Sequence, residues 1–305
     1  MISVKKVLNN HNFHINNISY KNNSKILETD EGKFILKSKR TNKEQLFNYL
    51  KDRNFNNFLP LENNSNEPYE LYRFINETTI SPQDKAIDLI YILSMLHIKT
   101  TTYEEINLDQ IKKIYEMTKN EISSLKNYYL DLQDYIETKV YMSPAEYLLI
   151  RHISKIHSAL NYADNTLENW YKEKKVQKKE RRVLLHRNLT LDHFLKEKTA
   201  YFINWDYSRK GLVIYDFLNF YKNEYQNLEM ESLFELYQSK YRYTKDEKLL
   251  FLSLLAIPYK VDFKKTNYIN TLEVRKLIIY VEKTNRFISK EYEKDQKAYQ
   301  EKFEQ

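Results

Sequence analysis

The chain has 305 residues, of which 42% are hydrophobic, so it is long enough to bury a sizeable core in one large domain or two lobes. It has no cysteine, which excludes disulfides, thiolate metal sites and cysteine nucleophiles, and its 2 glycines argue against glycine-dependent phosphate loops. The net charge is +7, but 49 basic residues face 42 acidic ones, and this mixed balance gives no reason to expect nucleic acid as a partner.

The first 75 residues are predicted to form a small sheet that carries one helix. Asp30-Glu31-Gly32 has the composition of a hairpin turn between two alternating segments. Thr41-Asn42-Lys43-Glu44 has the form of a capping box, and the apolar stripe after it predicts a helix. The expected strands are residues 18–20, 25–29, 33–37, 58–61 and 69–75.

The rest of the chain is predicted to be mainly helical. Ser81-Pro82 is a typical helix start, with proline at the first helical position. The loop before it suggests a lobe boundary, which gives an N-terminal lobe of residues 1–78 and a C-terminal lobe of residues 79–305. No apolar run approaches the ~20 residues of a membrane span, so no transmembrane segment is expected.

Two long helices and a basic segment follow. Residues 103–138 carry a helical pattern, and Ser143-Pro144-Ala145-Glu146 caps a helix that runs to about residue 175. Residues 172–182 are strongly basic, and we interpret them as a solvated helix end and loop. No aromatic platform is interleaved with these charges, which speaks against a nucleic-acid site.

Residues 183–221 are the most informative segment. A short apolar strand leads to His186, a polar loop follows, and a hairpin leads to Asn204-Trp205-Asp206, before Tyr215-Asp216-Phe217 opens a helix. This order resembles the catalytic segment of the aminoglycoside-phosphotransferase/choline-kinase branch of the protein-kinase-like fold. The resemblance implies an α+β, two-lobed fold, with a small antiparallel-sheet N-lobe and a large, mainly helical C-lobe that carries the catalytic loop.

The same resemblance assigns nucleotide-binding positions in the N-lobe. Lys37 stands where the family has its phosphate-binding lysine, and Glu44 would either pair with Lys37 or only cap its helix. Tyr72 and Phe74 lie on the strand that leads to the hinge beside the adenine. Residues 16–25, where the family has its phosphate-covering loop, contain no glycine, which hinders close approach of the backbone to phosphates.

The positions that perform phosphoryl transfer in the family are replaced. Asn188 occupies the catalytic aspartate position, and loss of a general base typically costs ~10²–10⁴-fold in rate. His193 stands at the magnesium-binding asparagine and Asn204 at the magnesium aspartate, although Mg²⁺ prefers oxygen ligands that carry charge. His186, which stabilises the loop in the family, is retained.

Two nearby carboxylates leave an alternative open. Asp206 follows Asn204 by two residues, and strand alternation would put both side chains on one face. Asp192 lies in the loop beside His193. Either carboxylate could restore metal binding, or it could be an ordinary turn or cap residue.

A narrower resemblance rests on the order and spacing of six segments. Together they resemble the spore-coat kinase-like proteins of endospore-forming Firmicutes, the CotS-related group and within it the YsxE type. The resemblance implies synthesis in the mother-cell cytoplasm during sporulation and later association with the spore coat and its proteins. The segments are residues 141–147, 167–171, 185–194, 201–206, 215–220 and 254–259.

Three functions are compatible with these features of the sequence. The first is a spore-coat-associated pseudokinase that acts as a binding or scaffold protein, needs no cofactor and retains at most a nucleotide or small-molecule ligand. The second is an active phosphotransferase that uses ATP and Mg²⁺ with displaced carboxylates, on a small hydroxylated substrate or a coat protein. The third is an unrelated helical interaction protein, which would lack the N-terminal sheet.

Overall fold

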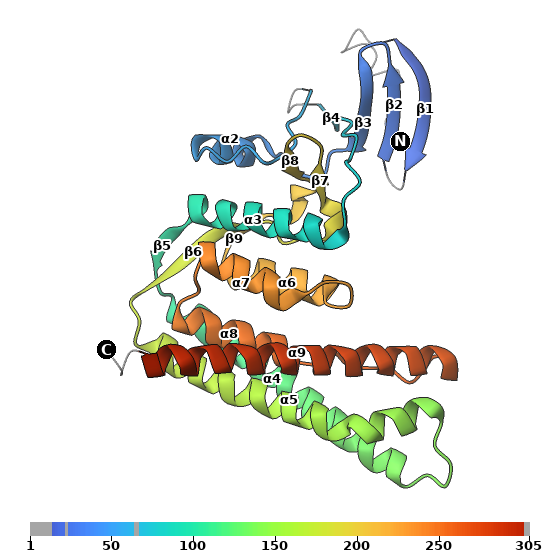
Figure 1. The fold of residues 1–305 in the computed structure, drawn as a ribbon, viewed down its shortest axis with the longest axis vertical. Coiled ribbons are helices and arrows are strands. Elements are labelled where there is room, and N and C mark those ends of the chain that lie inside the picture. Colours follow the sequence, from blue (N-terminus) through green and yellow to red (C-terminus); the bar gives the residue numbers. More distant parts are fainter. Residues whose placement is uncertain (1–13, 22–23, 64–66, 302–305) are drawn as a thin grey trace. The chain divides into compact units, whose positions relative to one another are not determined.

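The structure is a computed structural model that describes residues 14–21, 24–63 and 67–301 (Figure 1). By its internal contacts the chain divides into two compact units. Unit 1 consists of Met1–Thr101 and Val183–Lys210, and unit 2 of Thr102–Arg182 and Gly211–Gln305. The lobe boundary expected at residue 78 is not tested by this division and stays a prediction.

Unit 1 contains a four-stranded antiparallel sheet in the order β1-β2-β3-β4 (Figure 1). Gly32, with φ +129°, follows the turn between β2 and β3, where a side chain would be strained. Leu27, Phe34, Leu36, Tyr69 and Leu71 form the apolar core of the sheet. The strands are β1 Ile15–Lys21, β2 Ser24–Thr29, β3 Gly32–Ser38 and β4 Tyr69–Arg73.

The fifth strand expected at residues 58–61 is not formed. Phe58 makes only an isolated parallel bridge to Phe202, and the Phe202 amide donates to the Asn57 carbonyl at 2.9 Å. The Phe58 ring instead stacks on Phe47 at 4.5 Å, so the apolar residues that suggested a strand are buried by packing against a helix.

Helix α2, Glu44–Asp52, follows β3, but the predicted capping box is wrong. The helix begins after Lys43, whose side chain makes no capping hydrogen bond. The side chain of Asn42 accepts from the Glu44 amide at 3.1 Å instead, because a short asparagine side chain competes well for a free amide at a helix start.

The remainder of unit 1 joins a long helix to a short hairpin. Ser81 caps the helix as expected, since its hydroxyl accepts from the Asp84 amide at 3.1 Å. The elements are helix α3 Pro82–Thr100, strands β7 Phe194–Lys196 and β8 Ala200–Phe202, and the single-turn helices η1 Leu191–His193 and η2 Trp205–Tyr207. Strand β9, Arg209–Gly211, ends at the boundary between the units.

Unit 2 is mainly helical, and α5 packs against α4, α8 and α9 (Figure 1). Strand β5 pairs antiparallel with the first residues of β6. A cluster of aromatic rings fills part of the core: Phe217, Phe234, Tyr237, Tyr243, Phe251 and Phe287. The elements are β5 Thr102–Glu105, α4 Leu108–Glu137, α5 Pro144–Lys175, α6 Ile214–Glu224, α7 Met230–Lys240, α8 Lys245–Ala256 and α9 Asn267–Glu301. Strand β6, Lys179–Leu185, begins in unit 2, and its residues from Val183 onward belong to unit 1. The sheet and the helices confirm the predicted α+β class.

The basic segment 172–182 is not simply solvated, which corrects its interpretation. Lys174 is 3% exposed and lies between Glu180 and Asp246. Arg181 forms an ion pair with Glu247. These cations therefore serve as internal partners of carboxylates that lie close by or far along the chain, and sequence charge alone does not distinguish such a role from a solvated surface.

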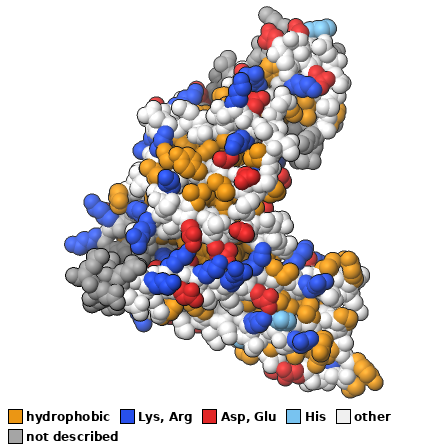
Figure 2. Space-filling model, in the orientation of Figure 1, with side chains coloured by type: hydrophobic (Ala, Val, Ile, Leu, Met, Phe, Trp, Pro, Cys, Tyr) orange, Lys and Arg blue, Asp and Glu red, His pale blue; other side chains and the backbone are white. Residues whose placement is uncertain are grey.

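On the face shown in Figure 2, basic and acidic side chains are interspersed along α9. This mixture matches the ion pairs made there, such as Lys294 with Glu235 at 2.5 Å and Lys248 with Glu291 at 3.0 Å. Among the helices of the described segments, none combines the length and the apolar character that crossing a membrane requires.

The capping box at the start of α5 gives a first prediction. The Ser143 hydroxyl accepts from the Glu146 amide, and the Glu146 carboxylate accepts from the Ser143 amide at 2.7 Å. Ser143→Ala should lower the free energy of unfolding by about 1 kcal/mol, measured by urea unfolding. Ser124→Ala, at an exposed position inside α4, is the control and should leave stability unchanged or slightly raised. Equal effects of the two changes would refute the capping role.

Candidate functional site

The segments around Lys37 and Asn204 meet within unit 1. Lys37, near the end of β3, donates from Nζ to Asn204 Oδ1 at 2.8 Å. Asn204 comes directly before η2 and adopts the left-handed conformation, with φ 63° and ψ 53°. Asparagine tolerates that conformation better than most residues, so the local sequence allows the turn that presents its amide to Lys37. The structure thus brings together two residues that the sequence singled out separately.

Lys37 lies in a partly buried setting. Burial lowers the pKa of its amine, and the opposing attraction of Asp206 and Glu70 does not cancel that effect. Arg40 and Lys43 lie near enough to lower the pKa of Lys37 further by repulsion. The contact described for its amine is to a neutral amide, so its charge is balanced only by carboxylates at longer range.

A buried lysine that the sequence did not indicate lies beside this pair. Lys43 is 3% exposed, and its Nζ lies 2.5 Å from Glu70 Oε1 and 2.7 Å from Asp206 Oδ1. Glu70 also accepts from the Tyr72 hydroxyl at 2.9 Å, and Asp206 accepts from the Thr41 hydroxyl at 3.4 Å. Burial, with Glu70 adding to it, raises the pKa of the Tyr72 phenol, so Tyr72 stays a proton donor.

These contacts decide how well the site suits Mg²⁺. Asp206, the carboxylate that could have restored metal binding, is engaged by the Lys43 ammonium. The amide oxygen of Asn204 is engaged by Lys37. Across the described segments, no group of three or more His, Asp or Glu side chains is arranged to hold a metal ion. A site whose oxygen donors already face two lysines does not fit a divalent cation.

The catalytic-loop segment is held by His186. Its ring is buried, and Nε2 lies 2.9 Å from the carbonyl oxygen of Ile203. The ring also packs edge-on against Trp205, with 4.7 Å between ring centroids, and against Phe202 at 5.3 Å. Arg187, the next residue, has φ 63°, so the chain turns sharply where the loop begins. This geometry suits the loop-stabilising role that the resemblance implies.

Asn188 and His193 face one another across the loop. His193 Nδ1 lies 2.6 Å from the backbone carbonyl oxygen of Asn188, and because a carbonyl only accepts, Nδ1 carries the proton. The His193 ring therefore uses one nitrogen to close the loop. Asp192, in η1 beside it, is exposed.

Two further residues named from the sequence lie apart from this network. Glu44 is exposed at the start of α2, and the Lys37 amine reaches Asn204 rather than Glu44. Phe74 directly follows the end of β4, and its amide donates to the Lys33 carbonyl at 2.8 Å. In the described segments, neither residue forms a hydrogen bond or ion pair with Lys43, Glu70 or Asp206.

Neither Lys43 nor Glu70 stood out as a site residue in the sequence. Lys43 lies inside the four residues that resembled a capping box, which offered a local explanation for its position. Glu70 pairs across the sheet with Lys37, so the strand register would have placed it near the site once β3 and β4 were aligned. That register was the signal that could have found it.

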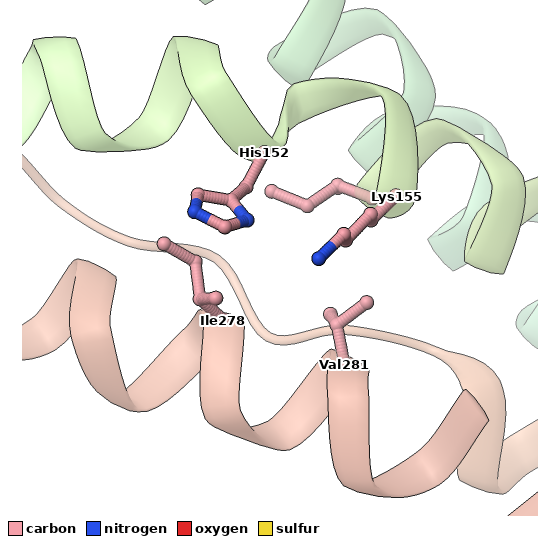
Figure 3. Close-up of a pocket in the computed structure, with 5 residues that line it drawn as sticks. His152, Lys155, Ile278 and Val281 are labelled. Carbon is pink, nitrogen blue, oxygen red and sulfur yellow. The ribbon is translucent and has the colours of Figure 1, made fainter. Parts of the chain in front are cut away.

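A small hollow lies elsewhere, between α5 and α9 of unit 2 (Figure 3). It is a shallow depression lined by His152, Lys155, Ile156, Ile278 and Val281. The amine of Lys155 is paired with Glu282 at 2.7 Å, and three of the five lining side chains are aliphatic. The hollow contains none of the residues that the sequence assigned to chemistry.

The left-handed conformation of Asn204 gives a second prediction. Asn204→Ala and Asn204→Gly both remove the amide that Lys37 binds, but only glycine adopts this conformation at no steric cost. The alanine variant should therefore be less stable than the glycine variant by about 1–2 kcal/mol in chemical unfolding. Equal stability of the two variants would show that the backbone at residue 204 is not held in this conformation.

No protein-family model and no curated protein matches the chain. Solved structures do match it in fold. An aminoglycoside phosphotransferase from Alicyclobacillus acidocaldarius is similar with a TM-score of 0.74 and 11% identity, over 96% of this chain and 96% of that one. Spectinomycin phosphotransferase is similar in its AMP-bound complex, with a TM-score of 0.57 and 12% identity over 92% and 96% of the two chains. Its complex with ADP and spectinomycin gives a TM-score of 0.54 and 12% identity, over 93% and 97%.

At these identities the likeness shows the fold alone. The chain has the two-lobed, protein-kinase-like fold of the aminoglycoside phosphotransferases, which confirms the predicted fold class. The narrower resemblance to spore-coat proteins stays a prediction.

Proposed function

We propose that this protein is a pseudokinase, which keeps the phosphotransferase fold and acts by binding rather than by phosphoryl transfer. One observation carries the proposal: the Lys43 ammonium lies 2.7 Å from Asp206, the carboxylate best placed by sequence to replace the lost magnesium ligand. Phosphoryl transfer depends on a metal that bridges the phosphates and offsets their charge. A site without that metal lacks the main source of transition-state stabilisation.

The acceptor side of the reaction is deficient as well. Asn188 has an amide where a carboxylate would accept the proton of the attacking hydroxyl, and its backbone carbonyl is engaged by His193. An amide can orient a hydroxyl but cannot take its proton. The two deficits act on different steps, so restoring only one of them should not restore turnover.

The biological setting that we propose comes from the sequence resemblance. The chain would be made in the mother-cell cytoplasm of a sporulating cell, then join the spore coat and act there as a scaffold that binds coat proteins, without a cofactor. The order and spacing of the segments that resemble spore-coat kinase-like proteins support this setting. A fluorescent fusion should outline the developing spore, and uniform fluorescence in the mother cell at the end of sporulation would contradict this setting.

The chemical part of the proposal is tested by a phosphoryl-transfer assay. The purified chain is incubated with ATP labelled at the γ-phosphate and Mg²⁺ or Mn²⁺, with water, spectinomycin, an amino alcohol and the chain itself as acceptors. We expect no transfer above the rate without protein. Transfer that saturates with ATP and disappears in the Lys37→Met variant would establish the alternative, an active phosphotransferase.

A further inference from the structure

Lys43 lies between Glu70 and Asp206, and we call these three residues the Lys43 cluster. It has the composition of a metal site in which the lysine ammonium occupies the place of the ion. Its two carboxylates, Glu70 and Asp206, have side chains that are 5% and 19% exposed, and Lys43 between them is 3% exposed. They come from β4 and η2, which are far apart in sequence. Two carboxylates that share one small site require a cation between them, because they repel each other strongly when poorly solvated.

We infer that Lys43 is a built-in cation that replaces a divalent metal, so that this site takes a phosphate-bearing ligand in its metal-free form. The inference rests on the proposed function, since an active enzyme would need the metal. Lys43 thereby has a role beyond the helix start that the sequence indicated, and a nucleotide would bind beside it without magnesium.

The charges around the cluster suit a metal-free anion. Arg40 and Lys43 both lie near enough to repel the Lys37 ammonium, and Glu70 and Asp206 are the carboxylates described as attracting it. Lys37 is partly buried and hydrogen-bonded to a neutral amide, and Arg40 is exposed. Lys37 and Arg40, counted with Lys43, Glu70 and Asp206, give the site one net positive charge, which attracts phosphate oxygens and repels a free divalent cation. Magnesium bound to ATP would reduce the ligand's negative charge and so weaken its attraction to Lys37 and Arg40.

A second buried lysine in unit 2 provides a matched control. Lys174 is also 3% exposed and also lies between two carboxylates, 2.9 Å from Asp246 and 3.3 Å from Glu180. Glu180, however, keeps a second cation, because Arg182 Nη2 lies 2.5 Å from its Oε1. Loss of Lys174 therefore leaves a partly neutralised pair, whereas no second ion pair is described for Glu70 or Asp206 apart from Lys43.

The experiment compares the wild-type chain with Lys43→Met, Lys43→Gln and Lys174→Met. Melting temperatures are measured in EDTA, in MgCl₂ and in MnCl₂, and ATP affinity is measured by calorimetry in EDTA and in MgCl₂. For the wild type we expect no stabilisation by either metal alone, and ATP binding that is equal or up to about 10-fold tighter in EDTA than in MgCl₂. The Lys43 variants should be stabilised by Mg²⁺ or Mn²⁺ alone and should bind ATP more tightly with metal, while Lys174→Met should show neither change.

Several results would overturn the inference. If the wild type binds ATP only when Mg²⁺ is present, the inference is wrong. This result needs only the wild-type chain, so it holds even if the Lys43 variants fail to fold. Absence of ATP binding in both EDTA and MgCl₂ would also overturn it, while leaving the pseudokinase proposal in place. Two further results would show that Lys43 is an ordinary structural lysine. One is a folded Lys43→Gln chain whose melting temperature does not rise with Mg²⁺ or Mn²⁺. The other is a Lys174→Met chain that these metals stabilise as much as they stabilise the Lys43 variants. Phosphoryl transfer by the wild type would instead refute the proposed function.

Discussion

Replacing Lys43 with methionine is expected to lower the free energy of unfolding by about 3–5 kcal/mol in EDTA. Methionine fills a similar volume but leaves Glu70 and Asp206 facing each other in a site where water can compensate little of their repulsion. The loss is therefore mainly the cost of uncompensated buried charge rather than of lost packing. Urea unfolding followed by circular dichroism measures it.

The matched control for this change is Lys85→Met. Lys85 forms an ion pair with Glu77, but the Glu77 side chain is 39% exposed and well solvated, so its removal should cost less than about 1 kcal/mol. Lys43→Arg is a second control, because it keeps the positive charge and should retain part of the stability. A loss below about 1 kcal/mol in Lys43→Met would show that Glu70 and Asp206 are not held together by this lysine.

Replacing Lys174 with methionine should lower the free energy of unfolding by about 3 kcal/mol, at the lower end of the range expected for Lys43→Met, because Arg182 still neutralises Glu180. Lys174 joins the end of α5 to β6 through Glu180 and to α8 through Asp246, and all three side chains are nearly buried. Lys119→Met is the control: Lys119 also contacts two carboxylates, Asp164 and Glu168, but its side chain is 33% exposed and the cost should stay under about 1 kcal/mol.

The ion-pair network of Lys174, Glu180 and Asp246 also makes stability depend on pH. Burial alone would raise the pKa of Asp246, but hydrogen bonds from Thr244 and Lys174 outweigh it and hold the pKa below its usual value. A carboxyl with a lowered folded-state pKa stabilises the fold above its unfolded pKa of about 4, and that stability is lost as the pH falls below this value. The difference in stability between the wild type and Lys174→Met should therefore be largest near neutral pH and shrink below about pH 4. A difference that grows on acidification would contradict this assignment.

Local patterns in the sequence predicted much of the fold. Each correct prediction depended on residues that lie within a few positions of each other. Examples are the turn at Asp30-Glu31-Gly32 and the helix starts at Ser81-Pro82 and Ser143-Pro144. These local patterns agree with the folded structure because the hydrogen bonds and turns that they predict form between neighbouring residues. The capping box predicted at Thr41-Asn42-Lys43-Glu44 was wrong, because the Asn42 side chain accepts from the Glu44 amide instead.

The site was harder to predict for a different reason. Positions 188, 193 and 204 could be singled out by likeness to a family, but their partners could not. Lys37 meets Asn204 across 167 positions, and Lys43 meets Glu70 across 27, so neither pairing leaves a local pattern. The basic run at residues 172–182 failed similarly, because its buried lysine is neutralised partly by Asp246, 72 positions away.

A crystal of the wild-type chain grown with ATP and soaked in MnCl₂ would test the role of Lys43 most directly, because manganese gives an anomalous signal that marks its own position. We predict that Lys43 Nζ remains between Glu70 and Asp206 and that no anomalous peak lies within coordination distance of Asn204 or Asp206. A manganese peak bound to Asp206, with Lys43 displaced, would contradict the replacement of the metal by this lysine.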